Sequence, residues 1–385
     1  MRRTIYNEDH EAFRSTLRDF LAKEVAPHFL EWEAAGHVPR DLYRQLGELG
    51  IFGIEVPEEY GGSGLKTLKY EAIINEEITR AGVGIGQTMA HSGLCLGYLK
   101  RYATDEQMRR WMPDFITGDA MYAVAMTEPG TGSDLAGIKT TAKLSEDGTH
   151  YVLNGAKTFI SGGLLADRVL VVCRTSPAPA ENRRLGLTIL HVDAHAEGFA
   201  VGRKLDKIGM RSYDTAELSF TDVKVPVEDV LGEEGQAFRY LAENLVSERL
   251  QCAVYDVAKA QAAINFALDY TKQRMVFGKP VASFQNTKFV LAECAAETEA
   301  GQVMADKALE MYDAGELTPA EAAKLKLFCS ELAGRVVDKC LQLHGGYGYM
   351  LEYPIARLYA DTRVSRIYGG TSEVMKIVIA KDLGL

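Results

Sequence analysis

The spacing of apolar residues changes twice along the chain, and this change constrains the fold more than any other feature. From Asn7 to about Gly118, apolar residues recur every three or four positions, as on the buried face of a helix. From about Ala120 to Val230 the period falls towards two, and turn residues recur roughly every eight to twelve positions, which is typical of short strands. From Gly235 onward the helical spacing returns. The sequence therefore predicts helices, then a β-module, then helices.

The expected elements follow this division. Before the β-module the pattern predicts helices around Phe13–Val25, over Tyr70–Arg80 and over Asp105–Ile116, the last capped by Thr104 and closed near Gly118. Within it the pattern predicts an exposed loop at Thr175–Arg184 and the strands Tyr122–Met126, Thr149–Ile160, Val169–Cys173, Gly186–Val192 and Glu217–Val225. After it the predicted helices are Gln236–Gln273, Ser283–Ala314, Thr318–Leu343, Pro354–Arg366 and Thr371–Asp382. Without long helices between the strands, we expect an antiparallel barrel or sandwich, followed by an antiparallel helical bundle.

Length, charge and cysteine spacing narrow the class of protein. A chain of 385 residues is too long for one hydrophobic core, so two or three domains are expected. The net charge is −10 without a basic stripe, which argues against nucleic-acid binding. The six cysteines lie far apart with no C-x-x-C pair, which favours reduced thiols in a cytoplasm over a zinc site or a disulfide framework. Residues 1–7 are too few for a signal or transit peptide.

One stretch has the length of a membrane span. Ala81–Leu99 contains no Asp, Glu, Lys or Arg. It carries five glycines together with Gln87, Thr88, His91 and Ser92, which makes it a poor spanning helix. We therefore expect a buried core helix and no membrane contact.

A single acid interrupts an apolar stripe on the first long C-terminal helix. The stripe positions are spaced by four, three, four and three residues, so they share one face: Leu241, Leu245, Glu248, Cys252 and Tyr255. Loss of hydration raises the pKa of such a carboxylate towards the range of a general base. The alternative is a buried ion pair, for which Arg249 is the nearest partner, and the helix pattern alone does not decide between the two.

Five further motifs are each ambiguous when taken alone. Residues 126–134 offer two glycines with Thr127 and Ser133 after a strand, which suits phosphate or flavin contact and also a simple β-turn. Asn154-Gly155 predicts a hairpin turn before a strand end with Phe159 and Ser161. The remaining motifs are a break at 274–279, a glycine-rich segment at 342–349 in which His344 is a cap or a catalyst, and a helix N-terminus at 368–373. The chain lacks G-x-S-x-G, a Walker A lysine, H-E-x-x-H and a strand–G-x-G-x-x-G–helix unit, which disfavours the corresponding enzyme classes.

Taken together and in order, these segments resemble the acyl-CoA dehydrogenase family over essentially the whole chain. The resemblance rests on MTEPGTGSD at 126–134, NGAKTFIS at 154–161, RMVFGK at 274–279, QLHGGYGY at 342–349 and YGGTSEVM at 368–375. SERL at 247–250 and the C-terminal motif look most like long-chain acyl-CoA dehydrogenases, and next like isovaleryl-CoA dehydrogenase. The resemblance implies three domains: an N-terminal helical domain (1–119), a middle antiparallel β-barrel domain (120–234) and a C-terminal four-helix-bundle domain (235–385).

The resemblance also implies FAD as cofactor and names its contacts. One set would line the flavin or the dinucleotide in the same subunit: Val124, Met126, Thr127, Gly132, Ser133, Phe159, Ser161, Thr371 and Glu373. Phe159 and Ser161 stand where many relatives have Trp and Thr. A second set would contact dinucleotide portions, including the FAD of a neighbouring subunit: Arg274, Val276, Phe277, Gln285, Gln342, Gly345 and Gly346. Contacts between subunits imply a homo-oligomer, a dimer at least and a tetramer by family habit.

The sequence departs from most relatives at Gly369, where they carry the glutamate that removes the α-proton. In the long-chain and isovaleryl enzymes this base sits at the helix position that matches Glu248, so the resemblance implies Glu248 as catalytic base. It further implies that Ser133, Arg249, Gly369 and Gly370 lie near the acyl-CoA substrate, with the backbone N–H of Gly369 on the thioester oxygen. Electrons would pass to an electron-transfer flavoprotein. Long or branched acyl chains are expected because a glycine at 369 leaves room near the α-carbon, and Ala81–Leu99 would line the acyl tunnel or serve as plain core.

Two other functions remain open on sequence grounds. One is a flavin desaturase that acts on an acyl group bound to a carrier protein, because the chemistry at the α and β carbons is the same. The other is a catalytically silent flavoprotein partner, suggested by the missing glutamate at 369.

Overall fold

A computed structural model describes residues 1–179 and 181–385, and it divides as the apolar spacing predicts. The N-terminal helices are α1 (Glu8–Phe20), α2 (Phe29–Ala35), α3 (Arg40–Glu48), α4 (Lys69–Ala81), α5 (Leu96–Tyr102) and α6 (Asp105–Thr117). The expected caps of α6 are confirmed, since Thr104 accepts a hydrogen bond from the backbone N–H of Gln107 and Gly118 adopts the left-handed conformation.

The middle of the chain forms one sheet of eight strands. They are β1 (Tyr122–Ala125), β2 (Thr141–Leu144), β3 (His150–Ser161), β4 (Arg168–Arg174), β5 (Leu187–Asp193), β6 (Phe199–Lys204), β7 (Thr215–Pro226) and β8 (Val230–Leu231). Their order is β6-β7-β3-β2-β4-β5-β8, with β1 beside β4. The sheet is mainly antiparallel as expected, and the exceptions are the parallel pair β1–β4 and one parallel bridge between β2 and β4. The predicted loop at 175–184 is confirmed for its described residues; Ala180 lies outside them.

The predicted hairpin turn at Asn154-Gly155 is wrong. Both residues lie inside β3, which runs through them with a shift of register against β7 between Leu153 and Gly155. The Asn154 side chain exchanges hydrogen bonds with Asp222, and a Cβ on Gly155 would lie 2.5 Å from Thr140 Oγ1. The glycine is therefore required by a bulge and a close backbone approach, and not by a chain reversal.

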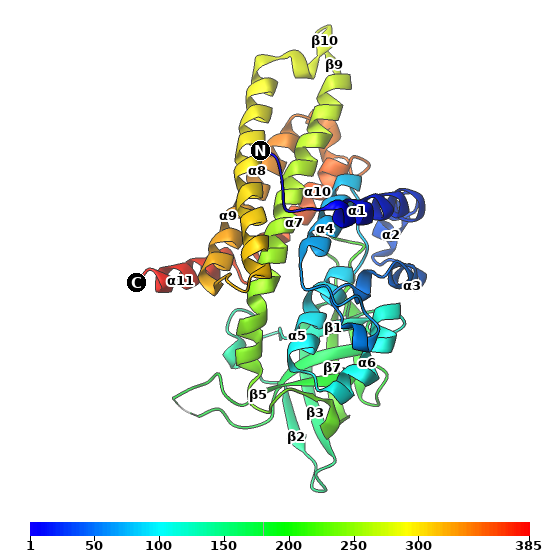
Figure 1. Cartoon of the computed structure of the whole chain (residues 1–385), viewed down its shortest axis with the longest axis vertical. Coiled ribbons are helices and arrows are strands. Elements are labelled where there is room, and N and C mark those ends of the chain that lie inside the picture. The colour runs from blue at the N-terminus through cyan, green and yellow to red at the C-terminus, as the bar shows by residue number, and fades with distance from the viewer. Residues whose placement is uncertain (180) are drawn as a thin grey trace.

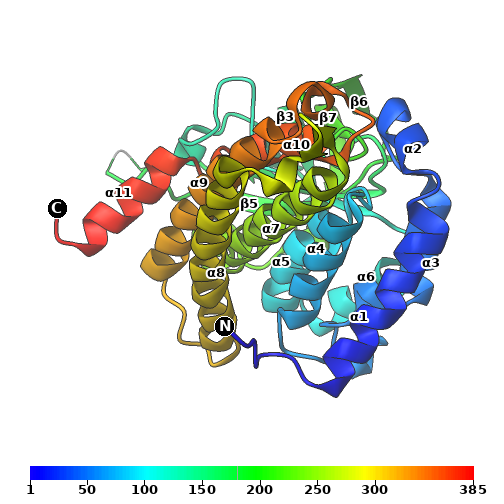
Figure 2. The ribbon, with the colours of Figure 1, turned by 90° about the horizontal axis from the view of Figure 1, so that it is seen from above.

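The C-terminal part is a bundle of long helices. These are α7 (Ala237–Gln273), α8 (Gln285–Asp313), α9 (Pro319–Gln342) and α10 (Pro354–Thr362), followed by α11 (Ser372–Asp382), which packs on α9. A two-stranded hairpin, β9 (Met275–Val276) with β10 (Lys279–Pro280), joins α7 to α8. Figure 1 shows this hairpin at one end of the molecule and the large sheet at the other. Seen from above, α7 lies between α4 and α5 on one side and α8 and α9 on the other (Figure 2).

The apolar stretch Ala81–Leu99 belongs to the core, but it is not one helix. Gly82 ends α4 in the left-handed conformation, and a π-helical turn over Met89–Cys95 then leads into α5. Most of these residues are buried between α4, α7 and β1. In the described part of the chain, no helix is both long enough and apolar enough to cross a membrane.

Candidate active site

Glu248 lies in the first third of α7, on the helix face that the stripe predicts. Leu241, Cys252 and Tyr255 of the same stripe are buried, and Glu248 is partly buried among them. Within residues 1–179 and 181–385, its carboxylate has no hydrogen bond within 3.5 Å and no ion pair within 4.0 Å. In particular, Arg249 does not pair with it, and the guanidinium instead points its Nε at the carbonyl of Gly369, 3.5 Å away. The buried ion pair that the helix pattern left open is therefore absent there.

The two glycines 369 and 370 lie directly opposite Glu248. Both have positive φ, +62° and +93°, in the region that favours glycine. A Cβ built on Gly369 would lie 3.6 Å from Glu248 Oε1 and 3.3 Å from Cys252 Sγ. A side chain at position 369 and the carboxylate of Glu248 therefore point into the same small space.

Electrostatics leave Glu248 suited to take up a proton. Burial raises the pKa of its carboxyl, and the charges of Arg249 and Lys326 lower that pKa only in part. Burial also lowers the pKa of Arg249, while the neighbouring Glu248 raises it. A carboxylate with a raised pKa and no fixed partner is free to accept a proton from a bound molecule.

The predicted flavin segments of the β-domain come together at the ends of β1 and β3. The N–H of Thr158 donates to the carbonyl of Thr127 at 2.9 Å, and the buried Nζ of Lys157 donates to the carbonyl of Met126 at 2.9 Å. This arrangement sets Phe159 beside the 126–133 segment. Phe159 has a φ of +59° and is 68% exposed, and a Cβ on Gly132 would meet nothing within 4 Å. An aromatic ring held outward in a strained conformation beside open backbone suits a flat ligand.

The second predicted cofactor set gathers at the far end of the bundle. The Arg274 guanidinium lies over the ring of Tyr347, 5.5 Å from its centroid, and so joins the hairpin to the glycine segment that contains Gly345 and Gly346. Phe277 is 93% exposed with a φ of +50°. Gln285 begins α8 at the same end, and Gln342 ends α9 there.

The two cofactor sets are far apart within one chain. Arg274 directly follows the last residue of α7, and at about 1.5 Å per residue it lies about 39 Å beyond Glu248 along the helix. Figure 1 shows the β9–β10 hairpin and the large sheet at opposite ends. The fold therefore does not bring Arg274, Val276 and Phe277 to the site of the same protomer.

For His344, the structure decides between the two roles that the sequence left open, a helix cap and a catalyst. His344 is buried, its Nδ1–H donates to the carbonyl of Cys340 at 2.8 Å, and its ring stacks on Tyr270, so it caps α9. All six cysteines are free and buried. Among the described residues, no group of three or more His, Cys, Asp or Glu side chains is placed to hold a metal ion.

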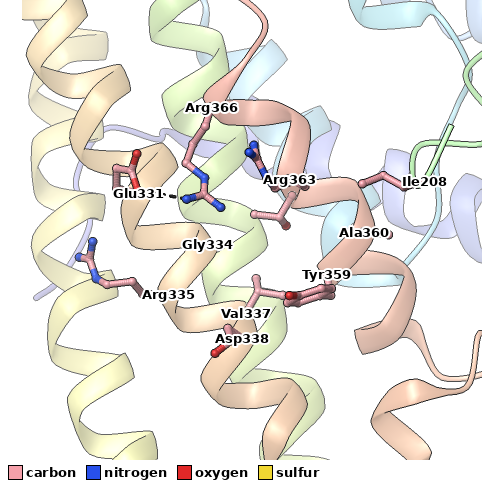
Figure 3. A pocket seen from close by; sticks show the side chains of 11 residues that line it. Ile208, Glu331, Gly334, Arg335, Val337, Asp338, Tyr359, Ala360, Arg363 and Arg366 are labelled. Atoms are coloured by element: carbon pink, nitrogen blue, oxygen red, sulfur yellow. Dashed lines mark hydrogen bonds and ion pairs between the residues drawn. The ribbon is translucent and has the colours of Figure 1, made fainter. Parts of the chain in front are cut away.

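Sequence reasoning missed Lys326 of α9. Its side chain is fully buried, and its Nζ donates to the carbonyl of Gly370 at 2.8 Å. The available signal was a lysine on the apolar face of a helix, spaced with Cys329, Ala333 and Val337. A pocket of about 550 Å³ lies between α9 and α10, and none of the predicted site residues lines it (Figure 3).

Comparison with known proteins identifies the family to which the chain belongs. Three domain profiles match the chain in order: acyl-CoA dehydrogenase N-terminal domain over residues 7–119, middle domain over 123–223 and C-terminal domain over 235–384. The chain therefore belongs to the acyl-CoA dehydrogenase family, which are oxidoreductases acting on CH–CH bonds.

Individual relatives match over nearly the whole chain. The long-chain specific mitochondrial acyl-CoA dehydrogenase of Sus scrofa is 40% identical over 99% of this chain and 88% of its own length. The crystal structure of an acyl-CoA dehydrogenase from Geobacillus kaustophilus superposes with a TM-score of 0.94 at 43% identity, covering 99% of each chain. An acyl-CoA dehydrogenase complexed with FAD from Bacillus anthracis superposes with a TM-score of 0.91 at 31% identity, covering 100% of this chain and 69% of that one.

Proposed function

We propose that this protein is an FAD-dependent acyl-CoA dehydrogenase in which Glu248 removes the α-proton. The product of a saturated acyl-CoA thioester would be the trans-2-enoyl-CoA. The observation that carries this proposal is the partly buried carboxylate of Glu248, which has no partner among the described residues and faces the empty side-chain position of Gly369. Membership of the family supports the reaction class, and this geometry supports the assignment of the base.

The chain's own residues account for the proton transfer. Glu248 takes the proton from the α-carbon, and burial favours the neutral form of its carboxyl. The developing enolate oxygen needs hydrogen-bond donors, and the backbone N–H groups of the Gly369–Gly370 turn supply them. Arg249 and Ser133 lie beside the thioester and pantetheine portions. When bound, FAD supplies the acceptor for the hydride that leaves the β-carbon.

FAD fits the residues that are present. In one subunit it would lie against Val124, Met126, Thr127, Gly132, Ser133, Phe159, Ser161, Thr371 and Glu373. The exposed ring of Phe159 offers a face to the flavin. The distant set would contact the FAD of a neighbouring subunit; its members are Arg274, Val276, Phe277, Gln285, Gln342, Gly345 and Gly346. Its separation from Glu248 along α7 supports this division.

This arrangement requires a homo-oligomer, and we propose a tetramer in the cytoplasm. The partners would be an acyl-CoA substrate and an electron-transfer flavoprotein. The proposed domains are residues 1–119, 120–234 and 235–385. The acyl group is proposed to be long or branched, because no side chain at 369 occupies the space near the α-carbon.

Anaerobic mixing of the purified yellow protein with acyl-CoAs of increasing length tests the proposal. Bleaching of the flavin by long or branched acyl-CoAs is expected, with the fastest rate identifying the substrate. Bleaching by an acyl-carrier-protein conjugate and by no acyl-CoA would replace the proposal with the carrier-bound desaturase. Bleaching by neither would identify a silent flavoprotein partner.

A further inference from the structure

The turn that carries the two glycines is fastened to one helix at three points. Glu331 of α9 lies at both ends of it: its carboxylate is 3.4 Å from Arg366, and it accepts a hydrogen bond from Ser372 Oγ at 2.8 Å. Figure 3 shows the Arg366 side chain extended towards Glu331 across the face of α9. Between these ends, Lys326 Nζ donates to the carbonyl of Gly370 at 2.8 Å.

The middle contact fixes the direction of a peptide group. In a trans peptide the C=O and the N–H point to opposite sides. Holding the Gly370 carbonyl against α9 therefore turns the N–H of Thr371 away from α9. Arg249 Nε approaches the Gly369 carbonyl in the same way, at 3.5 Å, and so turns the N–H of Gly370 away from Arg249. Over the described residues, neither N–H has an acceptor within hydrogen-bond distance.

We infer that Lys326 is a positioning residue, which fixes the Gly369–Gly370 turn and holds a positive charge beside Glu248. This inference rests on the proposed function, because it assigns Lys326 a role towards the proposed base. Lys326 touches neither the substrate nor the reacting atoms. The Lys326 side chain is fully buried, so its ammonium has no water around it. It is stabilised only by the Gly370 carbonyl and by nearby negative groups, and this ties its position to that of the turn.

The groups that face Glu248 come from three helices. Arg249 and Cys252 lie beside it on α7, Lys326 faces it from α9, and the buried hydroxyl of Tyr98 faces it from α5. Arg249 and Lys326 both lower the pKa of Glu248. Cys252 and Tyr98 are neutral below about pH 10, because burial raises the pKa of Cys252 to about 12 and raises that of Tyr98 well above its ordinary value. Removal of the Lys326 charge therefore leaves Arg249 as the remaining cation and raises the pKa of Glu248.

The experiment is the pH dependence of anaerobic flavin reduction in the holoenzyme, measured by stopped flow with the best acyl-CoA. In Lys326→Met, the acid limb of the rate is expected to move to higher pH by about one unit. The plateau rate is expected to fall about tenfold because the peptide group between Gly370 and Thr371 loses its fixed direction. A role in folding alone would lower Tm and the yield of holoenzyme but would not move the limb.

Three further variants make the result decisive. Lys259→Met removes an equally buried ammonium, one that pairs with Asp256 and Ser365 and contacts neither glycine, and it should lower Tm without moving the limb. Lys326→Gln keeps an N–H donor without the charge and carries the same test if Lys326→Met does not fold. Glu248→Asp shows whether the limb belongs to Glu248: a limb that does not respond to it contradicts the proposed base. If the acid limb moves in Glu248→Asp but stays at the wild-type position in a folded Lys326 variant, the inference about Lys326 is overturned and the proposed base is not.

Discussion

Glu248 and Asp256 are both carboxylates on α7, two turns apart, and they have opposite surroundings: Asp256 is fully buried and Glu248 is partly buried. Asp256 pairs with Lys259 at 3.3 Å and accepts a hydrogen bond from Ser365. Glu248 has no such partner among the described residues, and the two cations near it are directed at the carbonyls of Gly369 and Gly370. Burial raises the pKa of both carboxyls. A paired acid in the interior holds helices together, whereas an unpaired acid facing an open position is available for proton transfer.

The largest effect separates the two acids by activity. Glu248→Gln keeps the shape of the side chain but cannot accept the proton, so steady-state turnover is expected to fall about a thousandfold or more. Bound FAD, measured by its absorbance, should be retained. Near-normal turnover in Glu248→Gln would show that another residue is the base.

The second effect separates them by stability. Asp256→Asn leaves the Lys259 ammonium buried without a counter-charge, and the free energy of unfolding is expected to fall by about 3 kcal/mol. Urea unfolding at fixed protein concentration measures this change. The rate of flavin reduction per bound FAD should stay near that of the wild type. A large loss of that rate with little loss of stability would make Asp256 part of the catalytic site and remove the contrast.

A third prediction moves the carboxylate across the site. In a Glu248→Gln background, Gly369→Glu places a carboxylate whose Cβ starts 3.6 Å from the position of Glu248 Oε1. Turnover is expected to recover about tenfold over Glu248→Gln, and the left-handed backbone at 369 should cost about 1 kcal/mol of stability. Gly370→Glu is the matched control, because its Cβ would point at Met375, 2.7 Å away, and it should restore nothing.

The smallest effect is the pH dependence of stability. Because burial raises the pKa of Glu248, the folded protein holds this proton to higher pH than the unfolded chain does. The stability that comes from this proton is full below the ordinary glutamate pKa and is lost as pH rises through the raised pKa. Glu248→Gln cannot ionise, so its stability relative to the wild type should rise by about 1 kcal/mol over that window. Parallel unfolding curves from pH 4 to pH 8 would contradict a raised pKa.

The sequence predicted well wherever local periodicity and burial agree. The helices of the bundle, the caps of α6 and the stripe that contains Glu248 follow from spacing alone, because a helix needs one buried face. The turn predicted at Asn154-Gly155 is wrong because the glycine is needed for the close approach of Thr140, the residue before β2. A contact with a residue outside the local segment cannot be read from a two-residue turn motif. Lys326 was missed for the same reason: its partner, the carbonyl of Gly370, is distant in sequence. The helix pattern could not decide whether Glu248 pairs with Arg249 either. The packed side chains show that Arg249 is directed at the carbonyl of Gly369.

Exchange of the α-protons of an acyl-CoA with solvent deuterium tests the central claim most directly, because it reports the base without net oxidation. The measurement would use anaerobic holoenzyme with its flavin reduced beforehand and a saturated acyl-CoA in D₂O, with mass spectrometry of the recovered thioester. The wild type and Asp256→Asn are expected to incorporate deuterium at the α-carbon at similar rates, and Glu248→Gln to incorporate none above the rate without enzyme. Deuterium incorporation by Glu248→Gln at the wild-type rate would contradict the assignment of Glu248 as the base.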